Sequence, residues 1–215
     1  MISNEVRREI QNIVRGFIQE GERNTCSTTR NLLCGSFGTS PTIKSNFASN
    51  SIIKEREDKF LREWATSSGL WYPTLPEGSL YLAEGGESKV YFAEDRKHVI
   101  KVNDAGYYQR WTEYFNSLVL HNLFFPQTEY SLLGFSENAK GLVAILQQPY
   151  IRGGHANLAD IESLLNYNDF FKTKKQDYYN QTLGIALEDM HDENVVAKDE
   201  TLFFIDTIFY ILEVQ

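Results

Sequence analysis

The sequence Asp189-Met190-His191-Asp192-Glu193-Asn194 lies near the end of the chain, and a polar segment then leads into Leu202-Phe203-Phe204-Ile205-Asp206. The apolar run is typical of a buried strand, so Asp206 ends a strand that closely follows the loop with Asp189 and Asn194. Such a hairpin brings two carboxylates and an amide to one place. Oxygen ligands of this kind suit Mg²⁺. We therefore take Asp189, Asn194 and Asp206 as candidate site residues.

The spacing of these residues is typical of ATP-dependent phosphotransferases, whose catalytic loops read D-x-x-x-x-N. In such enzymes one carboxylate orients the attacking hydroxyl, while an amide oxygen and a second carboxylate hold Mg²⁺ against the phosphates. We predict that Asp189 is the catalytic base and that Asn194 and Asp206 bind the metal. The alternative is that all three are polar loop residues beside a buried strand, because this spacing is common by chance.

Upstream, residues 80–92 are typical of a strand, a glycine turn and a second strand. Gly85 and Gly86 would let backbone N–H groups approach phosphate oxygens, and Ser88 would add a hydroxyl. The pattern is an incomplete form of G-x-G-x-x-G, and an ordinary hairpin turn is the alternative interpretation.

The next strand, His98-Val99-Ile100-Lys101-Val102, carries one lysine and matches the V-A-I-K pattern. Lys101 would act in catalysis and bind the inner phosphates of ATP. A helix is predicted over residues 107–122, and Glu113 is its only carboxylate, which makes it the candidate ion-pair partner of Lys101. The alternative interpretation makes both side chains solvent-exposed.

Two further strands, residues 131–135 and 141–146, precede the segment Gln147-Gln148-Pro149-Tyr150-Ile151. Phosphotransferases of this type read adenine with main-chain groups at such a segment. We expect the Gln148 carbonyl and the Tyr150 N–H to contact adenine, with Pro149, which has no N–H, between them.

Several of these runs together resemble the kinase-like domain of polyvalent proteins encoded by bacterial phages and conjugative elements: Glu84–Tyr91, Val99–Lys101, Leu120–Tyr130, Gly134–Phe135 and Gln148–Ile151. The resemblance covers about residues 55 to 207. It implies a protein-kinase-like fold with an ATP site built from Lys101, Asp189, Asn194 and Asp206. It leaves the phosphate acceptor undetermined.

The expected fold is therefore α+β and two-lobed, with a five-stranded antiparallel upper sheet carrying one helix. Asp206 is followed by Thr207 rather than the Phe-Gly pair of protein kinases, and few residues remain for an activation segment. We therefore expect a truncated helical lower lobe with helices at Leu158–Tyr167 and Tyr178–Leu187. The predicted divisions are an N-terminal helix and linker (residues 1–50), an upper lobe (51–148) and a reduced lower lobe (149–215).

The predicted activity is ATP- and Mg²⁺-dependent transfer of a γ-phosphoryl group to a hydroxyl of a protein or a small molecule. The alternative is a pseudokinase, a nucleotide-binding or empty scaffold that acts through protein contacts. A net charge of −8 argues against a nucleic-acid partner. No apolar run is long enough to span a membrane, and two cysteines without a nearby histidine group suggest a reducing cytoplasm.

The N-terminal third contains an apolar stripe that predicts a helix over residues 4–20, with Ile10, Ile13 and Phe17 on one face. This face either packs on the rest of the chain or binds a protein partner. Residues 23–50 are rich in Ser, Thr and Asn and predict a long connection. A second helix is predicted from Ile53 to about Gly69.

Overall fold

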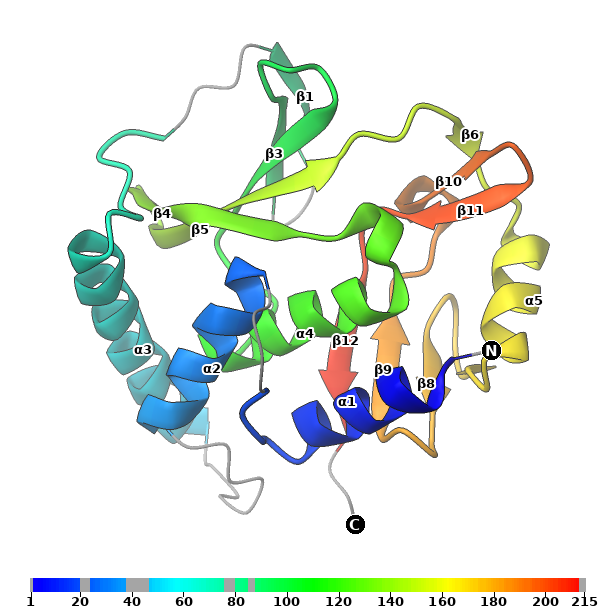
Figure 1. Cartoon of the computed structure of the whole chain (residues 1–215), viewed down its shortest axis with the longest axis horizontal. Helices are drawn as coiled ribbons and strands as arrows, with labels where there is room; N and C mark the ends of the chain where they lie inside the picture. Colours follow the sequence, from blue (N-terminus) through cyan, green and yellow to red (C-terminus); the bar gives the residue numbers. More distant parts are fainter. Residues whose placement is uncertain (1, 20–23, 38–46, 76–79, 85–87, 213–215) are drawn as a thin grey trace.

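The computed structural model describes residues 2–19, 24–37, 47–75, 80–84 and 88–212, and it is a mixed α+β structure (Figure 1). The α+β class is thereby confirmed, while the division into two kinase-like lobes stays a prediction. The α-helices are Asn4–Val14 (α1), Thr25–Phe37 (α2), Phe47–Ser67 (α3), Trp111–Phe124 (α4) and Leu158–Tyr167 (α5). Among the described residues, none of the helices combines the length and hydropathy needed to cross a bilayer.

The largest sheet has five antiparallel strands in the order β1-β2-β3-β5-β4, which confirms the predicted sheet. Strand β3 is central, and residues 99–103 of it are buried. The β-branched side chains of this strand suit a position covered on both faces. The strands are Leu80–Glu84 (β1), Ser88–Phe92 (β2), His98–Asn103 (β3), Ser131–Asn138 (β4) and Gly141–Pro149 (β5).

Helix α4 packs between this sheet and the C-terminal strands (Figure 1). The rings of Trp111 and Phe115 lie 6.0 and 6.1 Å from the ring of Phe135 on β4. At its other end, Phe124 stacks on Phe209 of strand β12 with ring centroids 5.3 Å apart. Aromatic pairs at these separations are favourable in addition to the area they bury. The helix therefore fixes where the two parts of the chain meet.

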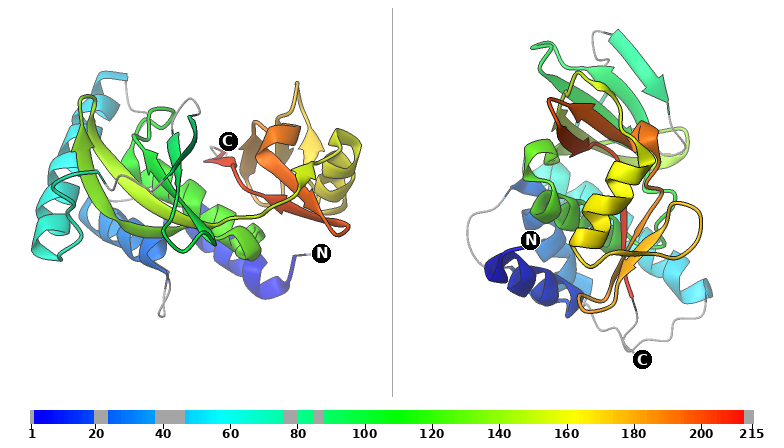
Figure 2. Two further views of the ribbon diagram at one scale, coloured as in Figure 1. Left: turned by 90° about the horizontal axis from the view of Figure 1, so that it is seen from above. Right: turned by 90° about the vertical axis from the view of Figure 1, so that its right-hand side faces the viewer.

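Two small antiparallel sheets, β11-β10-β6 and β12-β9-β8-β7, lie with α5 on the side of the molecule opposite α3 (Figure 2). The short 3₁₀ helix η1 (Pro126–Thr128) lies between α4 and β4, and η2 (Asp192–Asn194) lies between β9 and β10. The strands are Gly154–His155 (β6), Phe171–Lys172 (β7), Tyr178–Asn180 (β8), Ile185–Glu188 (β9), Val195–Lys198 (β10), Thr201–Phe204 (β11) and Ile208–Ile211 (β12).

The segment 178–187 forms the strands β8 and β9, so the helix predicted there is wrong. Burial along both strands alternates with the period of two that a strand requires. Between them, the N–H of Gly184 donates to the carbonyl of Asn180 at 3.0 Å, and Gly184 has a φ of 68°. Glycine adopts this left-handed conformation without strain, so the chain turns here instead of continuing as a helix.

Helix α2 lies inside the segment that the sequence predicts to be a long connection, so that prediction is wrong for residues 25–37. The Asn24 side chain caps the helix by accepting a hydrogen bond from the N–H of Cys26 at 3.1 Å. The buried face of α2 carries polar side chains that are paired, as when Arg30 Nε donates to Asn116 Oδ1 at 2.8 Å. A helix with such a face carries no apolar stripe from which it could be recognised.

Helix α1 packs within the chain, where Ile10 and Ile13 are fully buried. Arg30 of α2 donates a hydrogen bond to the Ile13 carbonyl at 3.2 Å near the C-terminal end of α1. The helix ends at Val14, earlier than predicted, because Gly16 adopts a φ of 75° that closes it. The apolar face of α1 thus has its partner in the same chain.

Glu57 of α3 holds the start of α4, and its side chain is fully buried. Its carboxylate accepts hydrogen bonds from the Trp111 N–H at 2.7 Å and from the Thr112 hydroxyl at 2.6 Å, and it pairs with Arg110 at 3.1 Å. A carboxylate at a helix N-terminus also complements the helix dipole. We infer that Glu57 fixes the position of the first turn of α4.

We expect Glu57→Ala to lower the free energy of unfolding by about 3–5 kcal/mol, because it leaves a partly buried arginine and the buried donors of Trp111 and Thr112 without their partner. Denaturant unfolding measures this loss. The control is Glu63→Ala on the same helix, since Glu63 is exposed and pairs with Lys59 one turn away. Its expected change is under about 0.5 kcal/mol. Equal changes in the two variants would contradict the role given to Glu57.

Candidate active site

A cleft of about 370 Å³ brings together five of the eight predicted site residues that the structure describes. Its walls come from β2, β3 and α4 on one side and from the loop before η2 and the segment after β11 on the other. Lys101, Asp189, Asn194, Asp206 and Ser88 all line it. Residues more than 100 positions apart in the sequence therefore share one cavity.

Lys101 reaches from the central strand into this cleft and is almost completely buried. Its Nζ donates to the Ile205 carbonyl at 2.8 Å and to the Tyr130 hydroxyl at 3.1 Å, and it lies 3.7 Å from Asp206 Oδ1. Burial lowers the pKa of Lys101, and the nearby Asp206 carboxylate opposes that effect. The ammonium group is thus held at the segment that carries the predicted metal ligand.

The predicted ion pair between Lys101 and Glu113 is not formed, so that expectation is wrong. Glu113 stands in the first turn of α4, and its Oε2 accepts a hydrogen bond from the Gln109 N–H at 3.0 Å. Burial raises the pKa of this carboxyl group. A glutamate at the third position of a helix commonly reaches back in this way to backbone N–H groups that precede the helix.

Tyr130, rather than the predicted Glu113, is a side-chain partner of Lys101. Its hydroxyl donates to the Ile205 carbonyl at 2.9 Å and accepts from Lys101, and its ring lies 5.1 Å from the lysine Nζ. Burial raises the pKa of Tyr130 well above its ordinary value. In the sequence, Tyr130 stands out only as the last residue of the run Leu120–Tyr130 that resembles the family. That resemblance predicts no chemical role for it.

Asp189 and Asn194 are joined directly within their loop. The Asn194 amide nitrogen donates to the Asp189 carbonyl oxygen at 2.7 Å and approaches Asp189 Oδ2 at 3.2 Å. Because that nitrogen faces Asp189, the amide Oδ1 is the atom that a cation would meet. Asp189 has a φ of 62°, a conformation that costs energy in a residue other than glycine and often occurs at functional sites. Its carboxylate is half exposed and also contacts His191 Nε2 at 3.0 Å.

Asp206 presents its carboxylate to the cleft, with 55% of the side chain exposed. Its backbone N–H lies 3.4 Å from the Asn194 carbonyl, which also accepts from the Ile205 N–H at 2.9 Å. The two predicted metal ligands are therefore neighbours. One carboxylate and one amide oxygen fit Mg²⁺, which commonly binds few protein ligands together with substrate phosphates. No group of three or more His, Cys, Asp or Glu side chains in the described residues could hold a metal alone.

The predicted phosphate loop is described only in part, because Gly85 and Gly86 lie outside the described residues. Ser88 begins β2, and its Oγ accepts a hydrogen bond from the Asn103 side chain at 2.8 Å. That contact places the hydroxyl beside β3, at the edge of the cleft that contains Lys101.

The predicted adenine contacts lie at the end of β5. The Tyr150 N–H donates to the Lys97 carbonyl at 2.8 Å, so it becomes available to adenine only if that bond opens. The Tyr150 ring packs on Phe92 with centroids 4.8 Å apart. The Gln148 side chain is buried and donates to the Thr128 carbonyl at 2.8 Å. Neither residue lines the cleft, which extends under α4 instead.

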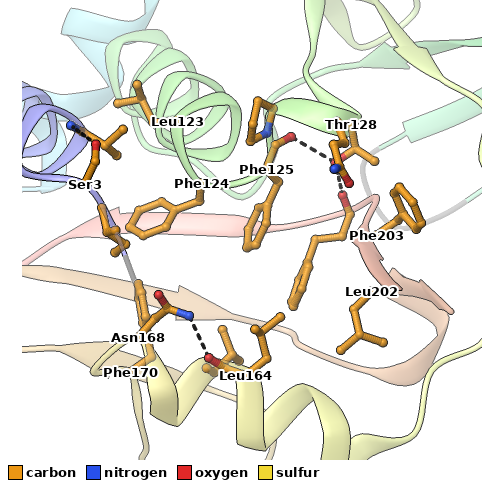
Figure 3. A pocket seen from close by; sticks show the side chains of 16 residues that line it. Ser3, Leu123, Phe124, Phe125, Thr128, Leu164, Asn168, Phe170, Leu202 and Phe203 are labelled. Carbon is orange, nitrogen blue, oxygen red and sulfur yellow. Dashed lines mark hydrogen bonds between the residues drawn. The ribbon is translucent and has the colours of Figure 1, made fainter. Parts of the chain in front are cut away.

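A second cavity of about 350 Å³ lies between α1, the end of α4, α5 and β11 (Figure 3). Aromatic and aliphatic side chains such as Phe124, Phe170 and Leu164 form most of its wall. None of the predicted site residues that the structure describes lines it. The predicted site residues that line one of these two cavities thus all lie in the first cleft.

His121 is a buried histidine of α4, and its burial predicts that the folding stability of the protein depends on pH. Burial lowers its pKa from 6.5 to about 3. The unfolded chain binds a proton at this position below pH 6.5, while the folded chain stays unprotonated down to about pH 3. Stability therefore falls as the pH drops through this window, by about 1.4 kcal/mol per pH unit from this residue.

Urea unfolding at several pH values between 7 and 4 tests this dependence. We expect His121→Gln to reduce the slope of stability against pH, whatever its effect at neutral pH. His155→Gln is the control, because His155 is exposed, and it should keep the wild-type slope. An unchanged slope in His121→Gln would contradict the burial of a neutral imidazole.

The comparison with known protein families fits this geometry. The model of the family described as serine/threonine/tyrosine kinase found in polyvalent proteins matches residues 54–213, which is more than half of the chain. The chain belongs to this family. Kinases transfer phosphoryl groups from a nucleotide, so membership in this kinase family implies nucleotide use. No curated protein and no solved structure matches the chain.

Proposed function

We propose that this member of the polyvalent-protein kinase family is an ATP- and Mg²⁺-dependent phosphotransferase. The observation that carries the proposal is the meeting of Lys101, Asp189, Asn194 and Asp206 in one cleft. These residues come from β3, from the loop before η2 and η2 itself, and from the segment that follows β11. A cation, two carboxylates and an amide are the groups that phosphoryl transfer requires, because catalysis of this reaction consists mainly of positioning and charge stabilisation.

Each residue has a defined task in this proposal. Asp189, half exposed, accepts the proton of the attacking hydroxyl, and its contact with the Asn194 amide fixes the loop. Asn194 Oδ1 and the Asp206 carboxylate hold Mg²⁺, and the Lys101 ammonium binds the inner phosphates. Mg·ATP supplies the γ-phosphoryl group. The acceptor is a hydroxyl of a protein or a small molecule.

Thermal unfolding with added nucleotide tests this proposal. A ligand that binds the folded state at 100 times its dissociation constant stabilises it by about 2.7 kcal/mol, which raises the melting temperature by several degrees. We expect ATP to raise the melting temperature with Mg²⁺ present and to raise it less with EDTA. An unchanged melting temperature at millimolar Mg·ATP would contradict the proposal.

Tyr130→Phe is expected to weaken Mg·ATP binding about tenfold, because the variant removes a hydroxyl that fixes Lys101 and leaves the ring in place. Titration of nucleotide binding measures the change. Tyr179→Phe on β8 is the control and should bind as wild type, since Tyr179 does not line the cleft. Wild-type affinity in Tyr130→Phe would remove this residue from the site.

A pseudokinase is the second candidate, and one observation favours it. The Lys101 ammonium is already bonded to the Ile205 carbonyl and lies near Asp206, so phosphates would have to compete with these contacts. The two candidates differ in turnover. Saturable Mg·ATP binding without ADP formation, with any acceptor supplied, would favour the pseudokinase.

A further inference from the structure

Thr207 follows the predicted metal ligand Asp206, where protein kinases carry phenylalanine. Its side chain is turned inward and is only 8% exposed. The hydroxyl lies 2.7 Å from Nδ1 of His121, a fully buried residue near the end of α4. The position at which protein kinases carry an apolar phenylalanine is therefore occupied here by a side chain that forms a hydrogen bond.

The contact that the other ring nitrogen of His121 makes determines which of His121 and Thr207 donates the hydrogen bond between them. His121 Nε2 lies 2.8 Å from the Thr128 carbonyl, which can only accept, so Nε2 carries the proton. Burial keeps the imidazole neutral, with a pKa of about 3. Nδ1 is then an acceptor, and the Thr207 hydroxyl donates to it. Valine at position 207 would leave Nδ1 without its donor.

Thr128, labelled in Figure 3, fixes the other end of the same segment. Its hydroxyl donates to the Phe204 carbonyl at 2.6 Å, and the ring of Phe204 stacks on Phe125 with centroids 4.2 Å apart. The Thr128 carbonyl accepts from both His121 and the buried Gln148 side chain. The Phe204 end of the segment 204–207 is thus bonded to the connection between α4 and β4, and its Thr207 end is bonded to the last turn of α4.

The Asp206 carboxylate itself is held much less firmly than its backbone. It is half exposed, and its nearest cation, Lys101, lies 3.7 Å away. The main chain on either side is fixed by the bonds of Phe204, Ile205 and Thr207. The position at which this carboxylate meets a cation is therefore set by the backbone. A displacement of about 1 Å at such a group can cost a hundredfold in function.

We propose that His121 is a positioning residue: through Thr207 and Thr128 it fixes the segment 204–207 and thereby places the Asp206 carboxylate for Mg²⁺. The inference rests on the proposed function, because Mg²⁺ bound with ATP is the ligand that Asp206 would hold. It adds to that function two residues: His121, which does not line the cleft, and Thr207, which lines the cleft and bonds to His121.

Thr207→Val tests this inference, because valine keeps the shape of threonine and removes the hydroxyl. Thr207→Ser restores the hydroxyl and should behave as wild type. The matched control is Thr29→Val, which removes the hydroxyl of a fully buried threonine that bonds within α2. If Thr207→Val does not fold, Thr207→Ala takes its place with the same expected results.

Two measurements are made on these variants. In the ligand-free protein, amide hydrogen exchange at Ile205 and Asp206 should become about tenfold faster in Thr207→Val. In ATP titrations, the Mg²⁺ concentration for half-maximal binding should rise about tenfold, while ATP affinity in EDTA stays unchanged. Thr207→Ser and Thr29→Val should change neither the exchange rates at Ile205 and Asp206 nor the Mg²⁺ concentration for half-maximal binding.

The outcomes separate this inference from the proposed function. Wild-type protein that binds Mg·ATP, together with a Thr207→Val variant of unchanged exchange and unchanged Mg²⁺ requirement, would overturn the inference alone. Wild-type protein that does not bind Mg·ATP would overturn both. A Mg²⁺ requirement about tenfold higher in Thr207→Val, with the wild-type requirement in Thr207→Ser, is the result that we expect.

Discussion

Asp206→Asn is expected to weaken the Mg²⁺-dependent binding of ATP by about 100-fold or more. Loss of a residue that merely orients a metal ligand costs 10–100-fold in metal affinity, so loss of the charged ligand itself should reach at least the upper end. Asparagine has the shape of aspartate, and the bonds that fix the backbone of this segment remain. The fold should therefore persist while the metal site loses its charge.

The measurement is ATP binding as a function of Mg²⁺ concentration. Asp199→Asn is the matched control, because Asp199 lies in the turn between β10 and β11 with a φ of 47°, which asparagine tolerates. This control should bind as wild type. If Asp206→Asn kept the wild-type Mg²⁺ dependence, the assignment of Asp206 as a metal ligand would be refuted.

Asp189→Asn is expected to reduce the rate of ADP formation by about 10³-fold and to leave ATP affinity within a few-fold of wild type. General base catalysis contributes about 10²- to 10⁴-fold, and asparagine cannot accept the proton of the attacking hydroxyl. The variant keeps the fold, since asparagine adopts the left-handed backbone conformation found at this position.

Single-turnover ADP formation with saturating Mg·ATP measures this effect. Asp192→Asn in the same loop removes an equal charge and should retain the wild-type rate, because Asp192 does not line the cleft. A combined loss of turnover and of ATP affinity in Asp189→Asn would point to a binding role. Unchanged turnover would exclude Asp189 as the base.

The sequence predicted the elements whose pattern is local and strongly periodic. The five strands of the largest sheet were recognised from runs of β-branched and aromatic residues separated by turns, and Lys101 was located by the apolar strand around it. The cleft then brings Lys101 to Asp206, which lie 105 positions apart in the sequence. The roles of both residues stay predictions.

Other elements could not be predicted because tertiary contacts determine them. The buried face of α2 carries Ser27, Thr29 and Arg30. The burial of Arg30 is stable only because Asn116 and the Ile13 carbonyl, far from it in the sequence, accept its hydrogen bonds. Sequence alone reveals no such partners. The sequence predicts Glu113 as the partner of Lys101 because it is the only carboxylate of its helix. In the structure the Glu113 carboxylate instead accepts a hydrogen bond at the start of α4, and the Tyr130 hydroxyl contacts Lys101.

Calorimetric titration of Mg·ATP into the wild-type protein, with Lys101→Ala in parallel, tests the central claim most directly. We predict saturable binding to the wild type and a marked loss of affinity in the variant, because the alanine removes the only lysine that lines the described cleft. No heat of binding to the wild type at millimolar nucleotide, which corresponds to an affinity weaker than about 4 kcal/mol, would contradict the claim that this cleft binds Mg·ATP.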